Sequence, residues 1–255
     1  MKISDLKDSP DPKETEFYKK NGLTSLYIGI DRRYEDGELK VVRGFHQYQP
    51  SFRKPRDTFI ILHNLANHLS QKKFGVQIRQ GIFSTRSEHH ADIFGNEVYR
   101  FIPDDGYDMF YNPKVKDFTV HSLNGHENSQ KQRRVIERGV REIMRNAFFD
   151  HSFKSSDYIK HLLEGVDKIN YDTFNVFEVS KAYFDKYFNE HKDKFKYLGD
   201  KVYQKKFYTE LEKFWQEYYN DVKFYVDGLK KVTDIKEVGE DIEIITFPYN
   251  GFWLI

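Results

Sequence analysis

The end of the chain constrains the fold most, because it is an apolar run that has to be buried. Two acids, Asp241 and Glu243, head a β-branched segment, and alternate residues of a strand share one face of a sheet. Pro248 and Gly251 then favour a turn into a second short strand, Phe252–Ile255. We therefore predict that the last sixteen residues form the closing hairpin of a sheet, with an acidic pair at its mouth. The alternative is an ordinary hairpin whose acids are solvated.

The composition narrows the class of protein. A chain of 255 residues is long enough for one large domain, or for one domain with an insertion. Acidic and basic residues nearly balance, at a formal net charge of +1, so the whole protein is not a strongly basic nucleic-acid binder. The absence of cysteine excludes disulfides, thiolate catalysis and cysteine zinc sites. Because the first residues are polar and no apolar run approaches the ~20 residues of a membrane helix, we expect a cytoplasmic protein without a membrane partner.

Hydrophobic periodicity indicates an α+β fold with short strands. We predict strands at 23–30, 39–45, 74–79, 81–84, 98–102 and 118–121, and two more after 242. We predict helices at 58–70 and 85–95, and several more between 130 and 230.

The helical pattern is concentrated in one long stretch of the sequence. It follows a polar linker that ends near Ser129, and strand character returns only at Ile242. Its most regular part is a stripe of aromatic and aliphatic residues from Phe207 to Leu229, which we expect to lie in a core. We therefore predict that residues 1–124 and 233–255 form one sheet domain, and that residues 125–232 are a mostly helical insertion within it.

Three separated motifs occur in order along the predicted sheet domain. Arg43-Gly44 ends one strand, Ser84-Thr85-Arg86 follows another, and Asp241-Ile242-Glu243 heads the final strands. In this order and strand context they resemble the Arg, Ser-Thr-Ser and Glu-x-Glu motifs of the arginine–serine–glutamate class of ADP-ribosyltransferases. The resemblance covers residues 23–121 and 237–255.

The resemblance implies a fold of split antiparallel β-sheets and a mono-ADP-ribosyltransferase that uses NAD as a substrate, without a metal. Cleavage of the nicotinamide–ribose bond passes through an oxocarbenium-like centre, as glycoside cleavage does. The resemblance assigns Glu243 as the catalytic carboxylate that stabilises this charge, at a partly open cleft mouth. It assigns Ser84 as the hydroxyl that fixes Glu243 and the ribose. The expected acceptor is a macromolecule, with protein as the first choice.

The remaining motif residues are assigned to binding by the same resemblance. Arg43, followed by Gly44, would bind the pyrophosphate of NAD in bidentate fashion. Thr85 would shape the strand that carries the catalytic serine, and Asp241 would orient the acceptor. The side chain of Asp241 is one methylene shorter than the Glu or Gln that the family more often has there.

Three departures from the family pattern keep a second hypothesis open. They are Asp241 itself, Arg86 in place of the second serine, and the long gap that the helical block places before Glu243. The loop Arg53-Lys-Pro-Arg-Asp-Thr58 is also similar to one in uncharacterised bacteriophage proteins, which implies the host cytoplasm or the virion as the location. The second hypothesis is therefore a non-catalytic phage structural or host-interaction protein that keeps the fold.

A predicted helix within the insertion carries a stripe of arginines opposite its apolar face. At about 100° per residue these side chains fall within about 60° of one another. They are Arg134, Arg138, Arg141 and Arg145. Such a stripe can bind nucleic-acid phosphates or an acidic protein, or it can be a solvated face neutralised by nearby acids. The histidines at 63, 68, 89 and 90 have no acids at matching spacing, so we expect packing and surface roles for them rather than a metal site.

Overall fold

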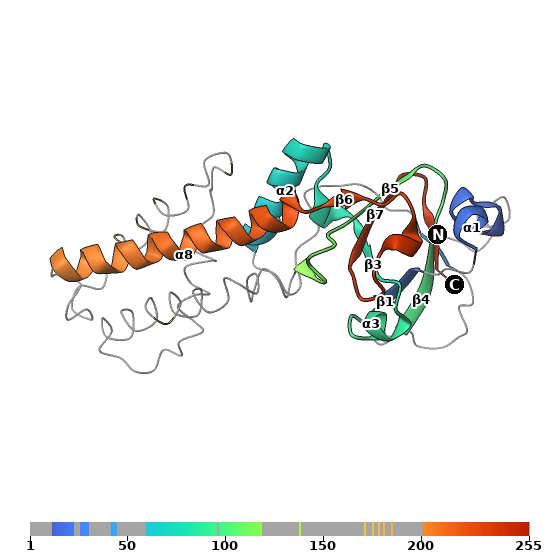
Figure 1. Ribbon diagram of the computed structural model, residues 1–255, viewed down its shortest axis with the longest axis horizontal. Helices are drawn as coiled ribbons and strands as arrows, with labels where there is room; N and C mark the ends of the chain where they lie inside the picture. The colour runs from blue at the N-terminus through green and yellow to red at the C-terminus, as the bar shows by residue number, and fades with distance from the viewer. Residues whose placement is uncertain are drawn as a thin grey trace. The chain divides into compact units, whose positions relative to one another are not determined.

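The computed structural model describes residues 12–22, 26–30, 42–44, 60–95, 97–118 and 201–254, with isolated positions at 138, 171, 175, 178, 181 and 185. The chain divides into two compact units. The first consists of Met1–Arg53, Gln77–Phe118 and Tyr225–Ile255, and the second of Lys54–Val76 and Thr119–Phe224. Helices and two antiparallel sheets occur together (Figure 1), which confirms the predicted α+β class.

Two four-stranded antiparallel sheets belong to the first unit. The order in sheet A is β1 (Leu26–Ile30), β4 (Glu97–Pro103), β8 (Phe252–Leu254) and β2 (Val42–Gly44). The order in sheet B is β3 (Ile82–Ser84), β7 (Ile244–Pro248), β5 (Tyr107–Tyr111) and β6 (Lys230–Lys231). The backbones of Tyr27 and Thr85 exchange hydrogen bonds of 2.7 and 2.9 Å, so β1 of sheet A meets the end of β3 of sheet B.

The last two strands do not pair with each other, so the predicted closing hairpin is wrong. β7 belongs to sheet B and β8 to sheet A, and the chain changes sheets after Pro248. The connection from β4 to β5 changes sheets as well, and the two connections bond to each other. The amide of Asp104 donates to the carbonyl of Gly251 over 2.9 Å, and the amide of Tyr249 donates to the carbonyl of Gly106 over 3.1 Å. Gly106 and Gly251 have φ angles of 78° and 125°, which glycine adopts without strain.

The two sheets share one hydrophobic core. Its buried members from the strands are Leu26, Ile82, Phe101, Ile102, Met109, Ile244, Trp253 and Leu254. Phe17 of helix α1 (Glu16–Asn21) joins them; Thr15 caps the start of this helix and Gly22, at φ 60°, ends it. Ile235 and Val238 also enter the core, from the segment that leads from β6 to β7. That segment carries the candidate acids and is therefore anchored by apolar side chains.

Helix α3 (Glu88–Asp92) packs closely on β1. Ser87 caps it by accepting a hydrogen bond from the amide of His90 over 3.1 Å. A Cβ atom on Gly29 of β1 would lie 2.0 Å from the carbonyl oxygen of Ala91 and 2.8 Å from the amide nitrogen of Gly95. The sequence places glycine where two backbones meet, and this contact sets the position of the connection that follows β3.

The segment 74–79 was predicted as a strand, and that prediction is wrong. Helix α2 (Ile60–Phe74) extends through Phe74, Gly75 follows it at φ 73°, and a 3-10 helix, η3, covers Ile78–Gln80. The alternation of apolar residues resembled a strand, but the left-handed glycine ends the helix and redirects the chain. Strands β5 and β6 were not predicted from the sequence.

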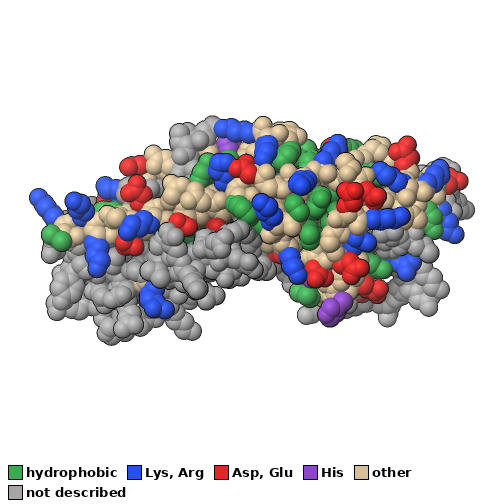
Figure 2. Space-filling model, viewed as in Figure 1, with side chains coloured by type: hydrophobic (Ala, Val, Ile, Leu, Met, Phe, Trp, Pro, Cys, Tyr) green, Lys and Arg blue, Asp and Glu red, His purple; other side chains and the backbone are tan. Residues whose placement is uncertain are grey.

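The second unit contains α2 and most of α8 (Lys201–Asp227). Both were predicted as helices, and both are confirmed. The buried stripe of α8 within this unit consists of Leu211, Phe214, Trp215, Tyr218 and Val222. Acidic and basic side chains of the described residues are interspersed over the face shown in Figure 2, in keeping with the balanced charge. The predicted strand at 118–121 lies outside the described residues except for Phe118, which is helical.

Candidate functional site

Ser84 and Thr85 lie where sheet B meets sheet A. Ser84 pairs with Ile244 across β3 and β7, and its hydroxyl donates to the Ile244 carbonyl over 3.3 Å. Thr85 follows at the bridge to Tyr27 of β1. The two side chains are buried, with relative exposures of 5% and 2%. The pairing places Ser84 directly beside Ile244, the residue that follows Glu243, and the Ser84 hydroxyl bonds the backbone there rather than the Glu243 carboxylate.

Glu243 is held by two side chains that the sequence analysis did not select. The Nη1 atom of Arg79 lies 3.3 Å from its Oε1, and the hydroxyl of Tyr225 donates to the same oxygen over 3.2 Å. The exposed fractions of the Arg79 and Glu243 side chains are 8% and 11%. The backbone amide of Glu243 donates to the Lys116 carbonyl over 2.8 Å. Glu243 is therefore far less exposed than the partly open cleft mouth that we expected.

Aromatic rings enclose the arginine of this cluster. The guanidinium carbon of Arg79 lies 4.2 Å from the ring centre of Phe83 and 4.5 Å from that of Phe118. The Phe118 ring in turn packs on Tyr225, with ring centres 4.6 Å apart. A guanidinium between two rings can be buried at lower cost, because it gains cation–π contacts as it loses water.

Tyr225 is a neutral hydrogen-bond donor. Its side chain is buried, and this burial together with the charges of Glu243 and Asp117 and the hydrogen bond to Glu243 raises its pKa well above 10, against the opposing charge of Arg79. At neutral pH its hydroxyl therefore stays protonated and donates a hydrogen bond to the Glu243 carboxylate. The backbone of Tyr225 is fixed as well, since its carbonyl accepts a hydrogen bond from the side-chain amide (Nδ2) of Asn112 over 2.7 Å.

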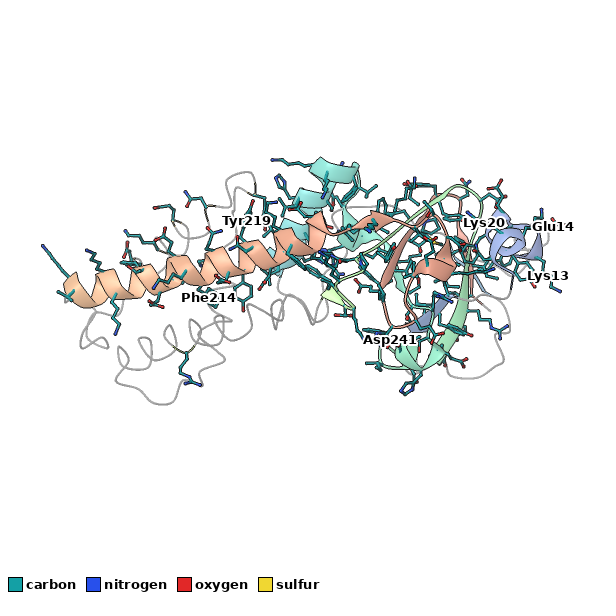
Figure 3. All side chains as sticks on the ribbon, in the orientation of Figure 1. Lys13, Glu14, Lys20, Phe214, Tyr219 and Asp241 are labelled. Atoms are coloured by element: carbon teal, nitrogen blue, oxygen red, sulfur yellow. The ribbon has the colours of Figure 1, made fainter. Side chains whose placement is uncertain are left out.

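Asp241 does not share a face of a strand with Glu243, so that prediction is wrong. Residues 240 and 241 form a turn, the amide of Ile242 donates to the Gly239 carbonyl over 3.2 Å, and β7 begins only at Ile244. The carboxylate of Asp241, labelled in Figure 3, pairs with Lys116 over 3.5 Å, and its side chain is 53% exposed. The two acids therefore have different surroundings, one solvated and one buried.

Arg43 and Gly44 lie on the other sheet. Their strand, β2, pairs with β8, with Arg43 opposite Trp253 and Gly44 opposite Phe252. β2 is one edge of sheet A, whereas β1, the opposite edge, is the strand that meets Thr85. The backbone pairing thus brings Ser84 beside Ile244, next in sequence to Glu243, and it does not bring Arg43 to them.

Arg79 and Tyr225 were not predicted as site residues, because each fitted the pattern of a secondary-structure element. Arg79 ended an apparent strand, and Tyr225 belonged to the apolar stripe of α8. The available signal was a polar group inside an apolar pattern, since a buried guanidinium or phenol needs a partner. A buried acid was the natural partner to search for, and Glu243 is the acid that the structure supplies.

The other predicted contact residues are only partly described. Of the arginine stripe, Arg138 alone lies in the described residues, where it is helical and exposed; the remaining three lie outside them. Within the described part of the chain, no cluster of three or more histidine, aspartate or glutamate side chains is arranged to hold a metal ion. No helix in that part is long and apolar enough to cross a membrane.

The comparisons with known proteins give no relative. No protein-family model matches the chain, and neither the curated proteins nor the solved structures contain a match. The site must therefore be interpreted from its own residues.

Proposed function

We propose that the protein transfers ADP-ribose from NAD to a macromolecular acceptor, with protein as the first choice. The observation that carries the proposal is the pairing of Ser84 with Ile244, which brings the backbone of Ser84 beside the residue that follows Glu243, at the junction of two antiparallel sheets. A serine at the end of one strand, paired with the residue after a glutamate on the next, fits the order and strand context of the motifs. The cytoplasm, or a phage virion, is the proposed location.

The proposed reaction breaks one bond and forms one. The glycosidic bond between C1′ of the ribose and the nicotinamide nitrogen breaks, and the electron pair leaves with nicotinamide. A nucleophile of the acceptor bonds to C1′ and releases its proton, or water does so in simple hydrolysis. In this scheme Glu243 stabilises the positive charge that develops at C1′, and Ser84 orients the ribose beside it. This partition of roles follows the motif resemblance, and the β3–β7 pairing ends at Ser84 and Ile244, one residue from Glu243.

The NAD phosphates and the acceptor need further residues. Arg43, with Gly44 beside it, is proposed to bind the pyrophosphate, and Thr85 to support the strand end that carries Ser84. Asp241 is proposed to face the acceptor, which fits its exposure of 53%. The edge position of β2 makes Arg43 the least supported of these assignments. The variant Arg43→Ala is therefore tested separately, by its affinity for NAD.

A second candidate is a non-catalytic phage structural or host-interaction protein that keeps this arrangement of sheets. The contacts of Glu243 with Arg79 and Tyr225 favour it. A carboxylate that is 11% exposed and already bound to a guanidinium has a structural role as the partner of a buried charge, and this role needs no substrate. Nucleic-acid binding through the arginine stripe could accompany either function, with Arg138 as its described member.

The deciding experiment measures NAD chemistry directly. Nicotinamide release without acceptor and incorporation of labelled ADP-ribose into a lysate are followed for the wild type, Glu243→Gln and the matched control Glu240→Gln, an exposed acid three positions away. Glu243→Gln should lower the rate by roughly a hundredfold or more, because a neutral amide cannot stabilise the developing charge. Glu240→Gln should retain the wild-type rate.

Two further measurements separate the candidates. Calorimetric titration with NAD should give binding to the wild type and weaker binding to Arg43→Ala if that arginine holds the pyrophosphate. A folded wild type that gives no heat with NAD and no nicotinamide release would leave the non-catalytic protein as the surviving candidate.

A further inference from the structure

The segment that carries Asp241 is held by two consecutive residues at the end of β3. The Nη1 atom of Arg86 donates to the carbonyl of Lys236 over 3.2 Å and to that of Val238 over 2.5 Å. The hydroxyl of Thr85 donates to the carbonyl of Glu240 over 2.6 Å. We call residues 234–241 the clamped loop. Three of its carbonyls are thus bound by side chains that follow Ser84 directly.

The clamped loop is anchored on one side and exposed on the other. Ile235 and Val238 are buried, with exposures of 2% and 1%, and Asp234 accepts a hydrogen bond from the amide of Lys236 over 2.9 Å. The side chains of Lys236, Glu237, Glu240 and Asp241 are exposed. Hydrogen bonds from a charged donor are stronger than neutral ones, so the two bonds from the guanidinium restrain the loop backbone strongly.

We propose that Arg86 and Thr85 are positioning residues that fix the clamped loop relative to the end of β3 and thereby set the place of Asp241. For the reaction itself this inference rests on the proposed function. It gives Arg86, which departs from the serine of the resembled motif, a definite task. A serine has one short hydroxyl, whereas the guanidinium reaches two carbonyls that are two residues apart.

Hydrogen exchange of the loop amides tests the clamp without any substrate. Three reporters donate within the loop or at its end, each over 3.2 Å: the amides of Glu237, Val238 and Ile242. In Arg86→Ala they should exchange roughly tenfold faster or more, since local opening loses two charge-assisted bonds. Thr85→Val should act in the same direction through one bond. Amides of β7 should keep their wild-type protection, which shows that the fold is intact.

Matched variants keep the exchange test decisive. Arg100→Ala removes an exposed arginine from β4 of the same unit and should leave the loop amides unchanged. If Arg86→Ala fails to fold, Arg86→Lys replaces it; a single ammonium lacks the planar fork, so an intermediate increase is expected. Loop exchange that stays within about twofold of wild type in a folded Arg86 variant overturns the clamp.

Activity separates a failure of this inference from a failure of the proposed function. If the wild type turns over NAD, Arg86→Ala should lower transfer to the acceptor more than hydrolysis of NAD, because Asp241 is displaced while Glu243 keeps its own partners. Faster loop exchange with an unchanged ratio of transfer to hydrolysis would overturn the positioning role in the reaction. A wild type without NAD turnover defeats the proposed function, and the exchange data still decide whether Arg86 and Thr85 hold the loop.

Discussion

Arg79 lies 3.3 Å from Glu243, and each of these charged side chains is about nine-tenths buried. They come from parts of the chain 164 residues apart, one from η3 and the other from the residue before β7. The two residues are adjacent in the structure although the whole helical block lies between them in the sequence. A buried ion pair of this kind costs desolvation when it forms, but breaking it is costly because one charge is left without its partner.

Removing Arg79 should therefore destabilise the protein strongly. Arg79→Met keeps an apolar side chain between the Phe83 and Phe118 rings but leaves the Glu243 carboxylate buried without the guanidinium. We expect a loss of about 3–5 kcal/mol in the free energy of unfolding, measured by urea denaturation. Lys116→Ala, which breaks the exposed pair with Asp241, is the control and should cost less than about 0.5 kcal/mol. Equal costs for the two variants would contradict the structural role given to Arg79.

The sequence predicted the parts of the fold whose pattern is local. The stripe of α8 and strands β1, β3 and β4 follow from the periodicity of their own residues. The pairing between strands that are distant in the sequence does not follow from local periodicity. Pro248 and Gly251 signal a turn, but turn residues alone do not say whether the chain returns to the same sheet, and here it crosses from sheet B to sheet A.

The same limit applies to the candidate site. Order and strand context selected Ser84 and Glu243, and the β3–β7 pairing brings Ser84 only to Ile244, the residue after Glu243. Consecutive residues of a strand point to opposite faces, and the Glu243 carboxylate is bound by Arg79, whose guanidinium lies on the ring of Phe83. The Asp241–Glu243 spacing predicted a common face only on the assumption of a strand, which the turn at 240–241 removes. Arg79 and Tyr225 could not be assigned to Glu243, because contacts between residues this far apart in the sequence are set by tertiary packing.

Gly29 should not tolerate a side chain. A Cβ at this position would lie 2.0 Å from the carbonyl oxygen of Ala91, and backbone atoms cannot move aside cheaply. Gly29→Ala should cost at least about 3 kcal/mol or prevent folding, as expected for overpacking against backbone. Gly239→Ala is the matched control, since its Cβ would meet only the flexible side chain of Ile242 at 3.1 Å. Its cost should stay below about 1 kcal/mol, and thermal unfolding of both variants provides the comparison.

Thr246→Val should stabilise the protein. Thr246 is completely buried in β7, and its hydroxyl has no hydrogen-bond partner among the described residues. Valine has nearly the same shape without the buried polar atom, so a gain of about 1 kcal/mol is expected. Thr85→Val makes the same chemical change where the hydroxyl does have an acceptor, the Glu240 carbonyl, and should be destabilising. Denaturation midpoints that move in the same direction for both variants would contradict this account of Thr246.

Tyr225 should make the protein less stable at high pH. Burial, the charge of Glu243 and the hydrogen bond to it keep the pKa of Tyr225 in the folded protein well above 10, whereas in the unfolded chain the phenol titrates near its ordinary value of about 10. Below pH 10 both states hold the proton and the stability is independent of this group. Above pH 10 the unfolded chain loses the proton while the folded protein keeps it, so the free energy of unfolding falls with pH, with a slope from this residue that rises toward about 1.4 kcal/mol per pH unit.

Tyr225→Phe isolates that contribution. The variant loses the hydrogen bond to Glu243 at every pH, which shifts its whole stability curve downward by a constant amount. Its slope between pH 10 and 11.5 should nevertheless be shallower than that of the wild type by up to about 1.4 kcal/mol per unit, because phenylalanine has no proton to lose. Between pH 7 and 9 the two curves should run parallel. Urea denaturation across this range measures both slopes, and parallel curves above pH 10 as well would show that the Tyr225 hydroxyl titrates alike in the folded and unfolded chain.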